Sequence, residues 1–444
     1  MSERHVDPVA LLTDRYELSV LRAALQSGRA ATSCVFEVFT RRLPTGRRYG
    51  VVAGTQRVLD AIADFRFDED DLQWLQDEGV VDPATAEHLR AYRFTGSVDG
   101  YPEGEVYFPA SPVLSFRGTF AECVLLETVV LSIMNHDAAV AAAASRMVTA
   151  AGGRPIIEMG SRRVHEGGAV AAARAAYIAG FDATSNLAAG RRHGIPTAGT
   201  ASHASVLLHA TEREAFAAQI DVLGLGTTLL VDTYDIGRGI EEAAAVAGPG
   251  LGAIRIDSGD LGVMARLARA QLDGLGLTQT RIVVSGDLDE HAIAALAVAP
   301  VDVYGVGTSV ATGSGAPTAG FVYKLVEVDG RPVAKRSDQK ATKGGAKAGF
   351  RAHRASGTAT DELVVVGATS ALEAEVARLR TEHHDVRRVS TSLVHDGRPA
   401  EGHDGSLAAA RTRLHDALEL LPWEGLSLTQ GDPVLATSML PGRR

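Results

Sequence analysis

Between residues 151 and 311 a short apolar run, a polar turn and an alanine-rich helical stretch follow one another repeatedly. This alternation is typical of βα units. The predicted strands are 155–159, 181–184, 195–199, 228–231, 253–256, 282–284 and 301–304. The predicted helices between them are 168–178, 212–222, 239–246, 261–275 and 289–296. Seven such strands in succession favour a parallel α/β barrel over an open sheet.

The segments on either side have a different pattern. Residues 1–125 mix predicted helices with β-rich segments that glycine and proline interrupt, and a long helical run at 127–150 leads into the barrel. After residue 355, apolar strands alternate with charged helices. We therefore expect an N-terminal α+β domain (1–125), a barrel that carries the catalytic site (126–354) and a C-terminal α/β segment (355–444) that packs on the N-terminal domain.

The amino-acid composition indicates which partners and which cellular compartment to expect. The formal net charge of −10 and the low aromatic content argue against broad binding to nucleic acid or to anionic membranes. The two cysteines are far apart, without metal-ligand spacing, which is typical of a reducing compartment. The chain shows neither a basic, apolar leader nor an uncharged run of membrane-spanning length. We expect a cytoplasmic protein without a nucleic-acid or membrane partner.

Chemically capable residues follow the predicted strands. They are Arg162, Arg163, Thr184, Ser185, His203, Asp232, Asp235, Asp257, Asp260, Asp287, Gly305 and Gly307. The carboxyl ends of the strands of a parallel barrel share one mouth, so these residues are expected to meet there. A single aspartate after a strand is more often a helix N-cap, but a whole ring of polar residues favours a site.

Three of these segments suggest phosphate and ribose chemistry. Residues 254–260 and 283–289 each carry Ser-Gly-Asp after an apolar strand, and such carboxylates suit ribose hydroxyls or a hydrated Mg²⁺ ion. Gly305, Gly307 and Thr308 can point backbone N–H groups at a monophosphate. A plain tight turn is the alternative for this last segment, because the G-x-G spacing alone is weak.

All five lysines of the chain lie in one short, glycine-rich interval. They are Lys324, Lys335, Lys340, Lys343 and Lys347, whereas every other basic side chain apart from histidine is arginine. Ammonium groups on flexible stems suit a mobile polyphosphate loop, and a solvated basic surface loop is the alternative. A monophosphate at one end and a polyphosphate at the other describe phosphoribosyl pyrophosphate, whose pyrophosphate leaves through an oxocarbenium-like centre.

Several motifs in order carry a resemblance to a known family. They are Leu12-Thr-Asp-Arg-Tyr16, Phe36-Glu-Val-Phe-Thr-Arg-Arg-Leu-Pro44, Gly160-Ser-Arg-Arg163, Gly180-Phe-Asp-Ala-Thr-Ser-Asn186, Gly199-Thr-Ala-Ser-His203, Val231-Asp-Thr-Tyr-Asp235, Arg255-Ile-Asp-Ser-Gly-Asp260 and Ser285-Gly-Asp-Leu-Asp289. From residue 11 to about 351 the chain resembles the nicotinate phosphoribosyltransferases. The resemblance implies an incomplete α/β barrel of the type II phosphoribosyltransferase kind with an N-terminal α+β domain.

The resemblance also implies an activity. Nicotinate and phosphoribosyl pyrophosphate would give nicotinate mononucleotide and pyrophosphate, with Mg²⁺, with coupled ATP hydrolysis and in the service of NAD synthesis. His203 matches the histidine that ATP phosphorylates, although a lone histidine in a loop is more often only hydrogen-bonded. Arg162 matches the arginine that holds the pyridine carboxyl group. Tyr16 matches an aromatic residue that stacks on the ring across a homodimer, although an isolated tyrosine is usually a core residue.

The same resemblance implies further roles. Arg255 and Asp257 match catalytic residues near the ribose, and Asp257 and Asp287 are the expected Mg²⁺ ligands. The expected sugar-phosphate cradle is Gly286, Asp287, Gly305, Gly307 and Thr308. The expected polyphosphate contacts are Lys335, Lys340 and Lys347.

Met159 departs from the family pattern, and Thr184 and Ser185 bear on the choice of substrate. Relatives commonly have phenylalanine where this chain has Met159, whose thioether can still pack on a pyridine ring. Related nicotinamide enzymes carry an aspartate near Thr184 and Ser185; the neutral residues here, with Arg162 close by, favour nicotinate as substrate.

Three rival functions stay open. The first is a phosphoribosyltransferase for nicotinamide or another pyridine, and the second is a non-catalytic nucleotide-binding protein of the same fold. The third is a phosphosugar lyase or aldolase. A Schiff-base version of that third class needs a lysine at a strand end, and none precedes Lys324.

Overall fold

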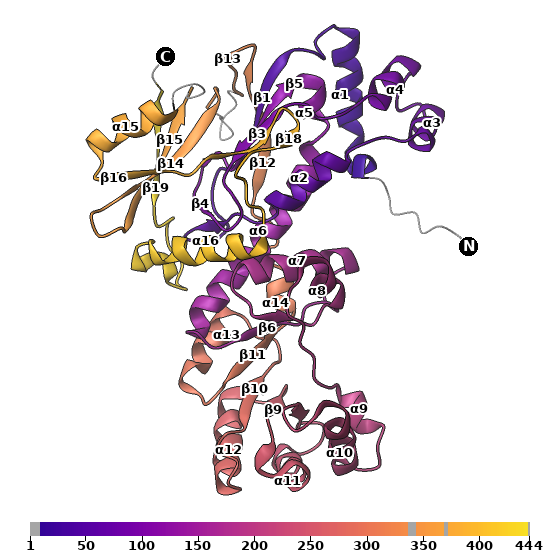
Figure 1. Cartoon of the computed structure of the whole chain (residues 1–444), viewed down its shortest axis with the longest axis vertical. Helices are drawn as coiled ribbons and strands as arrows, with labels where there is room; N and C mark the ends of the chain where they lie inside the picture. Colours follow the sequence, from indigo (N-terminus) through magenta and orange to yellow (C-terminus); the bar gives the residue numbers. More distant parts are fainter. Residues whose placement is uncertain (1–8, 336–342, 368–371, 443–444) are drawn as a thin grey trace. The chain divides into compact units, whose positions relative to one another are not determined.

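The computed structural model describes residues 9–335, 343–367 and 372–442. The chain folds into two compact units, coloured along the sequence in Figure 1. The first comprises residues 1–139 and 318–444, and the second comprises residues 140–317. Helix α6, Glu127–Ala151, begins in the first unit and ends in the second. No helix of the described residues has both the length and the apolarity needed to cross a bilayer.

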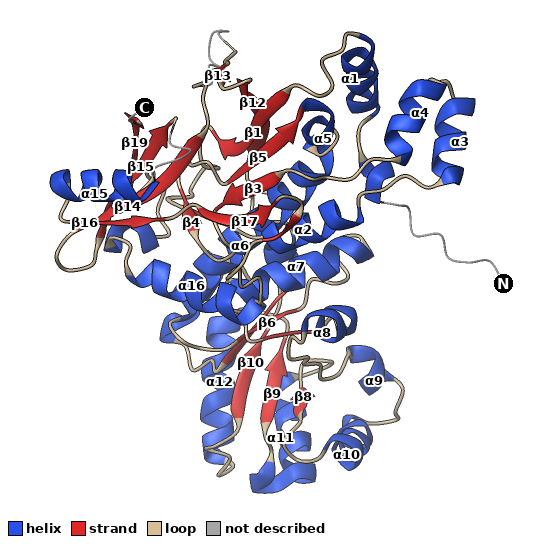
Figure 2. Ribbon diagram, turned by 45° about the horizontal axis from the view of Figure 1, so that its top comes forward, coloured by secondary structure: helices blue, strands red, loops and turns tan. Residues whose placement is uncertain are grey.

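The second unit is built around a six-stranded parallel sheet, part of which Figure 2 shows side by side. In spatial order its strands are β7 (Ala183–Thr184), β6 (Ile156–Glu158), β11 (Val303–Val306), β10 (Arg281–Val284), β9 (Ala253–Ile256) and β8 (Thr228–Leu230). The last strand in sequence, β11, pairs with the first, β6, which is the ring order of a barrel. Beyond β7 an isolated bridge between Thr184 and Thr197 continues the sheet, and nothing joins it to β8 within this fully described unit. The predicted incomplete parallel barrel is confirmed, and the expected strand at 195–199 contributes only this bridge.

Helices separate the strands of the second unit. They are α7 (Glu166–Ile178), α8 (Leu187–His193), α9 (His203–Leu207), α10 (Glu212–Leu223), α11 (Ile236–Ala247), α12 (Leu261–Gly274), α13 (Glu290–Ala295) and α14 (Thr308–Ala311), with 3₁₀ turns η2 (Gly248–Gly250) and η3 (Leu296–Val298). Most of the alanines of α7 are buried, so small side chains let the helix approach its neighbours closely.

The first unit contains antiparallel and mixed sheets. Its seven-stranded sheet has the order β13 (Arg331–Pro332), β12 (Phe321–Val328), β1 (Ser33–Thr40), β5 (Leu114–Thr119), β3 (Ser97–Gly100), β17 (Thr391–His395) and β18 (Arg398–Pro399). A four-stranded sheet has the order β16 (Asp385–Arg388), β14 (Lys347–His353), β15 (Ala359–Val366) and β19 (Ala436–Pro441), and β2 (Gly50–Val51) pairs with β4 (Val106–Tyr107).

Helices and an aromatic core complete the first unit. The helices are η1 (Val9–Leu12), α1 (Arg15–Gln26), α2 (Thr55–Asp64), α3 (Glu69–Asp77), α4 (Pro83–Arg90), α5 (Phe120–Val124), α15 (Leu372–Glu382), α16 (Leu407–Glu419) and η4 (Trp423–Leu426). In the core the ring of Tyr323 stacks on that of Phe36 at 5.0 Å and meets Phe116 at 5.4 Å. Strands that precede and follow the second unit in the sequence therefore share one core.

The division of the chain differs from the predicted boundaries. Residues 318–354, expected in the barrel, belong to the first unit, where β12 pairs with β1 from Phe321 opposite Thr40 to Val328 opposite Cys34. Strand β17 of the C-terminal segment pairs with β3 in the same unit. Hydrophobic periodicity reports the existence of each strand but not its distant partner, so these pairings left no trace in the pattern.

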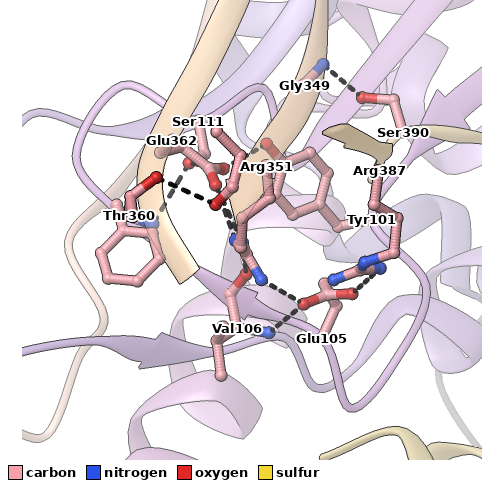
Figure 3. A network of polar contacts seen from close by, with 12 residues as sticks. Tyr101, Glu105, Val106, Ser111, Gly349, Arg351, Thr360, Glu362, Arg387 and Ser390 are labelled. Carbon is pink, nitrogen blue, oxygen red and sulfur yellow. Dashed lines mark hydrogen bonds and ion pairs between the residues drawn. The ribbon is translucent and has the colours of Figure 1, made fainter. Parts of the chain in front are cut away.

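A buried polar network links the loops and strands of the first unit (Figure 3). Arg351 donates to the carboxylates of Glu105 at 2.6 Å and Glu362 at 2.9 Å, and both carboxylates are fully buried. Tyr101 donates to the second oxygen of Glu362, and Arg387 donates to the second oxygen of Glu105 at 2.8 Å. The network joins β14 and β15 to the loop before β4.

Candidate functional site

One face of the parallel sheet changes from apolar to polar along the strands. A small apolar cluster consists of Ala253, Val283, Val303 and, partly buried, Ile157. Because side chains alternate along a strand, residues two positions later point to the same side. These residues are Arg255, Ser285, Gly305 and Met159. The apolar cluster is thus followed, at the carboxyl ends of four strands, by a layer in which Arg255 and Ser285 carry polar groups and Met159 and Gly305 do not.

This layer lines a pocket of ≈ 220 Å³ in the second unit. The lining residues are Met159, Arg162, Arg163, Arg255, Asp257, Ser285, Gly286, Asp287, Gly305, Gly307 and Thr308. The structure therefore brings together nine of the residues that the sequence placed at a site, from four separate strand ends. Met159 and Ser285 complete the wall.

The aspartates after the strands divide into two classes. The side chains of Asp235, Asp260 and Asp289 accept hydrogen bonds from backbone N–H groups in the first turns of α11, α12 and α13. They are helix N-caps, as a lone aspartate in this position usually is. Asp257 and Asp287 cap no helix and line the pocket.

A short polar chain fixes Asp257. Its backbone N–H donates to Oδ2 of Asp232 at 2.8 Å, and the Ser258 hydroxyl donates to the same oxygen at 2.7 Å. The Ser285 hydroxyl donates to Oδ1 of Asp257. One oxygen of the Asp257 carboxylate is therefore held by Ser285, which follows the neighbouring strand β10. This contact preorganises the carboxylate for a ligand.

Next to these hydrogen bonds, two buried side-chain atoms have no hydrogen-bond partner among the described residues. They are Oδ1 of Asp232 and Nε of Arg255. Burial lowers the pKa of Arg255, opposed by the nearby carboxylates of Asp257 and Asp232, and its Nη1 donates to the Thr200 hydroxyl at 2.9 Å. Buried polar atoms are normally paired, and of these two only Nε of Arg255 belongs to a residue that lines the pocket.

The Ser-Gly-Asp turn after β10 has an unusual backbone. Gly286 has φ +110°, and a Cβ there would lie 2.6 Å from the carbonyl oxygen of Asp257. Asp287 has φ +46°, which few residues other than glycine adopt. Strained backbone of this kind gathers at functional sites, where the surrounding structure enforces it.

Comparisons with known proteins agree with this geometry. Residues 11–135 match the nicotinate phosphoribosyltransferase N-terminal domain model. Over 443 residues, 98% of this chain and 96% of the other, the sequence is 60% identical to a nicotinate phosphoribosyltransferase of Mycobacterium tuberculosis. The chain belongs to the nicotinate phosphoribosyltransferase family. The human family member is 33% identical over 410 residues, 77% of this chain and 76% of that protein. The crystal structure of human nicotinic acid phosphoribosyltransferase superimposes with a TM-score of 0.81 at 28% identity, covering 97% of both chains.

Met159, whose thioether can pack on a pyridine ring, lines the pocket. Its Sδ lies only 2.9 Å from the place that a Cβ on Gly305 would occupy. Glycine at this position therefore makes room for the thioether at the wall of the pocket.

The structure separates the neighbours Thr184 and Ser185. Thr184 is fully buried, and its hydroxyl donates to Oε2 of Glu158 at 2.5 Å, which corrects its expected role as a ligand contact. Ser185 is exposed. Burial raises the pKa of the Glu158 carboxyl, a group that the sequence analysis missed because an acid at the end of an apolar strand resembles an ordinary surface residue.

His203 is the first residue of helix α9 and is half-buried. Its Nδ1 lies 3.2 Å from the hydroxyl of Thr233, on the loop after β8. His203 does not line the ≈ 220 Å³ pocket. The hydrogen bond from Arg255 to the Thr200 hydroxyl, three residues before His203, connects this part of the chain to β9.

The remaining predicted residues lie in the first unit. Lys335 is exposed, and Lys340 lies outside the described residues. Lys347 is buried, and its ammonium bonds the Glu37 carboxylate at 2.6 Å, so the structure assigns it to the fold rather than to a polyphosphate. The glycine-rich sequence around it concealed that Lys347 begins β14. Tyr16, on α1, is 47% exposed, and partial burial and the Glu127 carboxylate raise its pKa.

The pocket residues fit a Mg²⁺ ion that a substrate helps to hold. Among the described residues no group of three or more histidine, cysteine, aspartate or glutamate side chains is arranged to bind a metal ion. Mg²⁺ usually keeps several waters and takes one or two carboxylates together with substrate phosphates. Asp257 and Asp287 line the pocket as such a pair.

Proposed function

We propose that this chain transfers phosphoribose to nicotinate. The ring nitrogen of nicotinate forms a bond to C1 of phosphoribosyl pyrophosphate, and the bond from C1 to the pyrophosphate oxygen breaks. The observation that supports this most is the pocket that joins arginines, paired carboxylates and glycine-rich backbone in a chain of this family. The product, nicotinate mononucleotide, would serve NAD synthesis.

The charge of the pocket favours the ring acid over the amide. Arg162 and Arg163 line it with exposed guanidinium groups, which suit a carboxylate in bidentate contacts. Ser185 adds no charge, and the carboxyl of Glu158 is buried and accepts a hydrogen bond from the Thr184 hydroxyl. A neutral nicotinamide would leave the arginines without a counter-charge.

The opposite wall suits the phosphoribosyl group. We assign Asp257 to the positive charge that develops at the sugar and Arg255 to the phosphoryl oxygens nearby. Backbone N–H groups around Gly305 and Gly307, with Gly286 and the Thr308 hydroxyl, cradle the 5′-phosphate. Asp257 and Asp287 would hold Mg²⁺, which when bound neutralises charge on the departing pyrophosphate.

His203 accounts for coupling to ATP. In this proposal the γ-phosphoryl group passes from ATP to an imidazole nitrogen, ADP leaves, and later hydrolysis of the N–P bond releases phosphate. The Thr233 hydroxyl, 3.2 Å from Nδ1, orients the ring. When Nδ1 carries the proton and donates to Thr233, Nε2 is the free nucleophile.

Other parts of the proposal rest on family resemblance. Tyr16 would stack on the pyridine ring of the partner in a homodimer, and its half-exposed position on α1 leaves the ring available. Lys335 and Lys340 would contact the polyphosphate. We propose that the enzyme acts in the cytoplasm.

The deciding experiment measures mononucleotide formation by the purified chain with phosphoribosyl pyrophosphate and Mg²⁺. Nicotinate is compared with nicotinamide, each with and without ATP. Turnover of nicotinate that ATP stimulates is expected. Preference for nicotinamide would contradict the charge argument, and no product from either would favour another pyridine or a binding role.

A variant separates ATP coupling from transfer. His203→Ala should abolish ATP stimulation and the formation of phosphohistidine from γ-labelled ATP, whereas slow transfer without ATP persists. ATP stimulation that survives in this variant would refute the assignment of His203.

A further inference from the structure

Glu158 is a buried acid in an unexpected place. It ends strand β6, and only 1% of its surface is exposed. By the alternation of side chains it points away from the face that carries Met159 and the pocket. Among the ion pairs found in the described part of the chain, none includes Glu158. A buried carboxyl without a cation is costly, so its hydrogen bonds must explain it.

These hydrogen bonds join two loops. The N–H of Gly160 donates to one carboxyl oxygen, and the Thr184 hydroxyl donates to the other at 2.5 Å. The backbone carbonyl of Glu158 accepts from the N–H of Ser185 at 2.8 Å. One residue thereby connects the turn after β6 to the loop after β7.

The turn after β6 determines where Arg162 can reach. Arg163 N–H donates to the Gly160 carbonyl at 2.9 Å, which closes the turn around Arg162. A Cβ on Gly160 would lie 2.7 Å from Cβ of Ala311 and 2.8 Å from the Glu158 carboxyl, so the turn is tightly enclosed. The arginine side chain itself is exposed, so its position depends on this backbone.

We propose that Glu158 is a positioning residue for nicotinate. Its carboxyl clamps the arginine turn, residues 159–163, to the loop of residues 184–186, so that Arg162 and Ser185 face the same ring carboxylate. The proposal rests on the proposed function for the identity of the ligand. It adds that acid recognition depends on a residue that never touches the substrate.

A matched control exists at the other end of the same strands. Asp182, just before β7, accepts a hydrogen bond from the N–H of Ile156, at the start of β6, at 2.9 Å. It also ties these two strands with a carboxylate, but at their amino ends, away from the pocket. Asp182→Asn therefore tests a link between the strands that has no part in placing Arg162.

Kinetics of three variants test the clamp. Glu158→Ala should raise KM for nicotinate about 10- to 100-fold, a typical effect of losing an outer-sphere partner, and change KM for phosphoribosyl pyrophosphate less than about 3-fold. Glu158→Gln should recover most of the loss, because its oxygen can accept from Gly160 and its amide can donate to the Thr184 hydroxyl. Asp182→Asn should leave both KM values near those of the unchanged chain.

Several outcomes would overturn the proposal. They are an unchanged KM for nicotinate in Glu158→Ala, an equal rise for both substrates, a nicotinate-specific rise in Asp182→Asn, or a Glu158→Gln variant as impaired as the alanine variant.

Amide hydrogen exchange provides a readout that needs no activity. Glu158→Ala should speed exchange in residues 159–163 and 184–186, and Asp182→Asn should not. Faster exchange in a chain without transferase activity would support the clamp while the proposed function fails. Unchanged exchange would refute the clamp itself.

Discussion

The two units each bury a polar cluster, and the clusters differ in how completely their charges are paired. In the first unit, the guanidinium of Arg351 meets carboxylates on two sides and the Val106 carbonyl at 2.8 Å. Arg351, Glu105 and Glu362 contribute none of the buried side-chain atoms that lack a partner in the described residues. This network is complete without a ligand.

The polar groups at the pocket of the second unit are less completely paired. Nε of Arg255, which lines the pocket, and Oδ1 of the nearby Asp232 are buried without a partner, and Arg162 and Arg163 are exposed. Leaving polar atoms unpaired costs stability, so it is tolerated where a ligand supplies the missing partner. The comparison teaches that burial of charge alone does not mark a site; at the pocket, missing partners occur together with exposed arginines that line a cavity.

The largest effect is expected from Arg351→Met. It would leave the buried carboxylates of Glu105 and Glu362 without their shared cation, which typically costs about 3–5 kcal/mol. Urea denaturation checks the loss. Arg387→Met is the control, because that side chain is 41% exposed and its contact with Glu105 should contribute at most about 1 kcal/mol. Equal losses in the two variants would contradict the central role of Arg351.

The same network predicts a dependence on acid. Burial opposes ionisation of Glu105, but Arg351 and Arg387 prevail and lower its pKa from 4.5 to about 2. A lowered carboxyl pKa stabilises the fold above the unfolded value and loses that effect as pH falls through the folded value. Stability should therefore decrease from about pH 4.5 to pH 2, by on the order of 3 kcal/mol from this group. Arg351→Met should flatten this part of the profile, and an unchanged profile would contradict the assignment.

Lys347→Met tests whether this lysine stabilises the fold, as Arg351 does, or contacts a substrate, as we propose for the pocket residues. Its loss would leave Glu37, whose Oε1 already lacks a partner, buried without a cation. We expect a stability loss of about 3 kcal/mol and an unchanged KM for phosphoribosyl pyrophosphate. A raised KM with unchanged stability would return Lys347 to the polyphosphate role that the sequence suggested.

Sequence reasoning predicted the site better than the network. Strand ends are visible as apolar runs, and in a parallel barrel all of them meet at one mouth, so Asp257, Asp287 and Gly305 were placed together correctly. The same reasoning did not distinguish Asp257, which lines the pocket, from Asp260, which caps α12, because both aspartates closely follow β9. The alternation of side chains from Ala253 through Arg255 to Asp257 could have distinguished them, because it puts Asp257 on the pocket side of the sheet.

Lys347 and Glu158 lay outside what the sequence could show. Lys347 is neutralised by Glu37, 310 positions away, across strands whose pairing no local pattern reveals. Glu158 ends an apolar strand, and its partners Gly160 and Thr184 meet only when β6 and β7 pair. Both cases are contacts between distant segments, which local propensity does not encode.

Asp257→Asn should lower activity and leave stability nearly unchanged, whereas the main effect of Arg351→Met is a loss of stability. The asparagine keeps the hydrogen bond from Ser285 but removes the charge, so we expect a loss of about 100-fold in kcat/KM, or roughly 2.7 kcal/mol, with stability nearly unchanged. Asp260→Asn is the control, because its side chain only caps α12. An equal loss of activity in the control would mean that the whole turn, and not the Asp257 carboxylate, carries the effect.

Gly286→Ala should have the smallest effect and tests whether the strained turn serves the incomplete site. Alanine at φ +110° costs about 1–3 kcal/mol, and its Cβ would lie 2.6 Å from the Asp257 carbonyl, which must then move. We expect a loss of roughly 10-fold in kcat/KM, because a small displacement of Asp257 and Asp287 weakens contacts to the transition state. Gly276→Ala isolates the backbone cost, since Gly276 has φ +78° and nothing within 4 Å of its Cβ position. Both variants should lose stability, but only Gly286→Ala should lose activity. If Gly276→Ala lost as much activity, general destabilisation would explain the effect, and the turn would have no special part in placing the carboxylates.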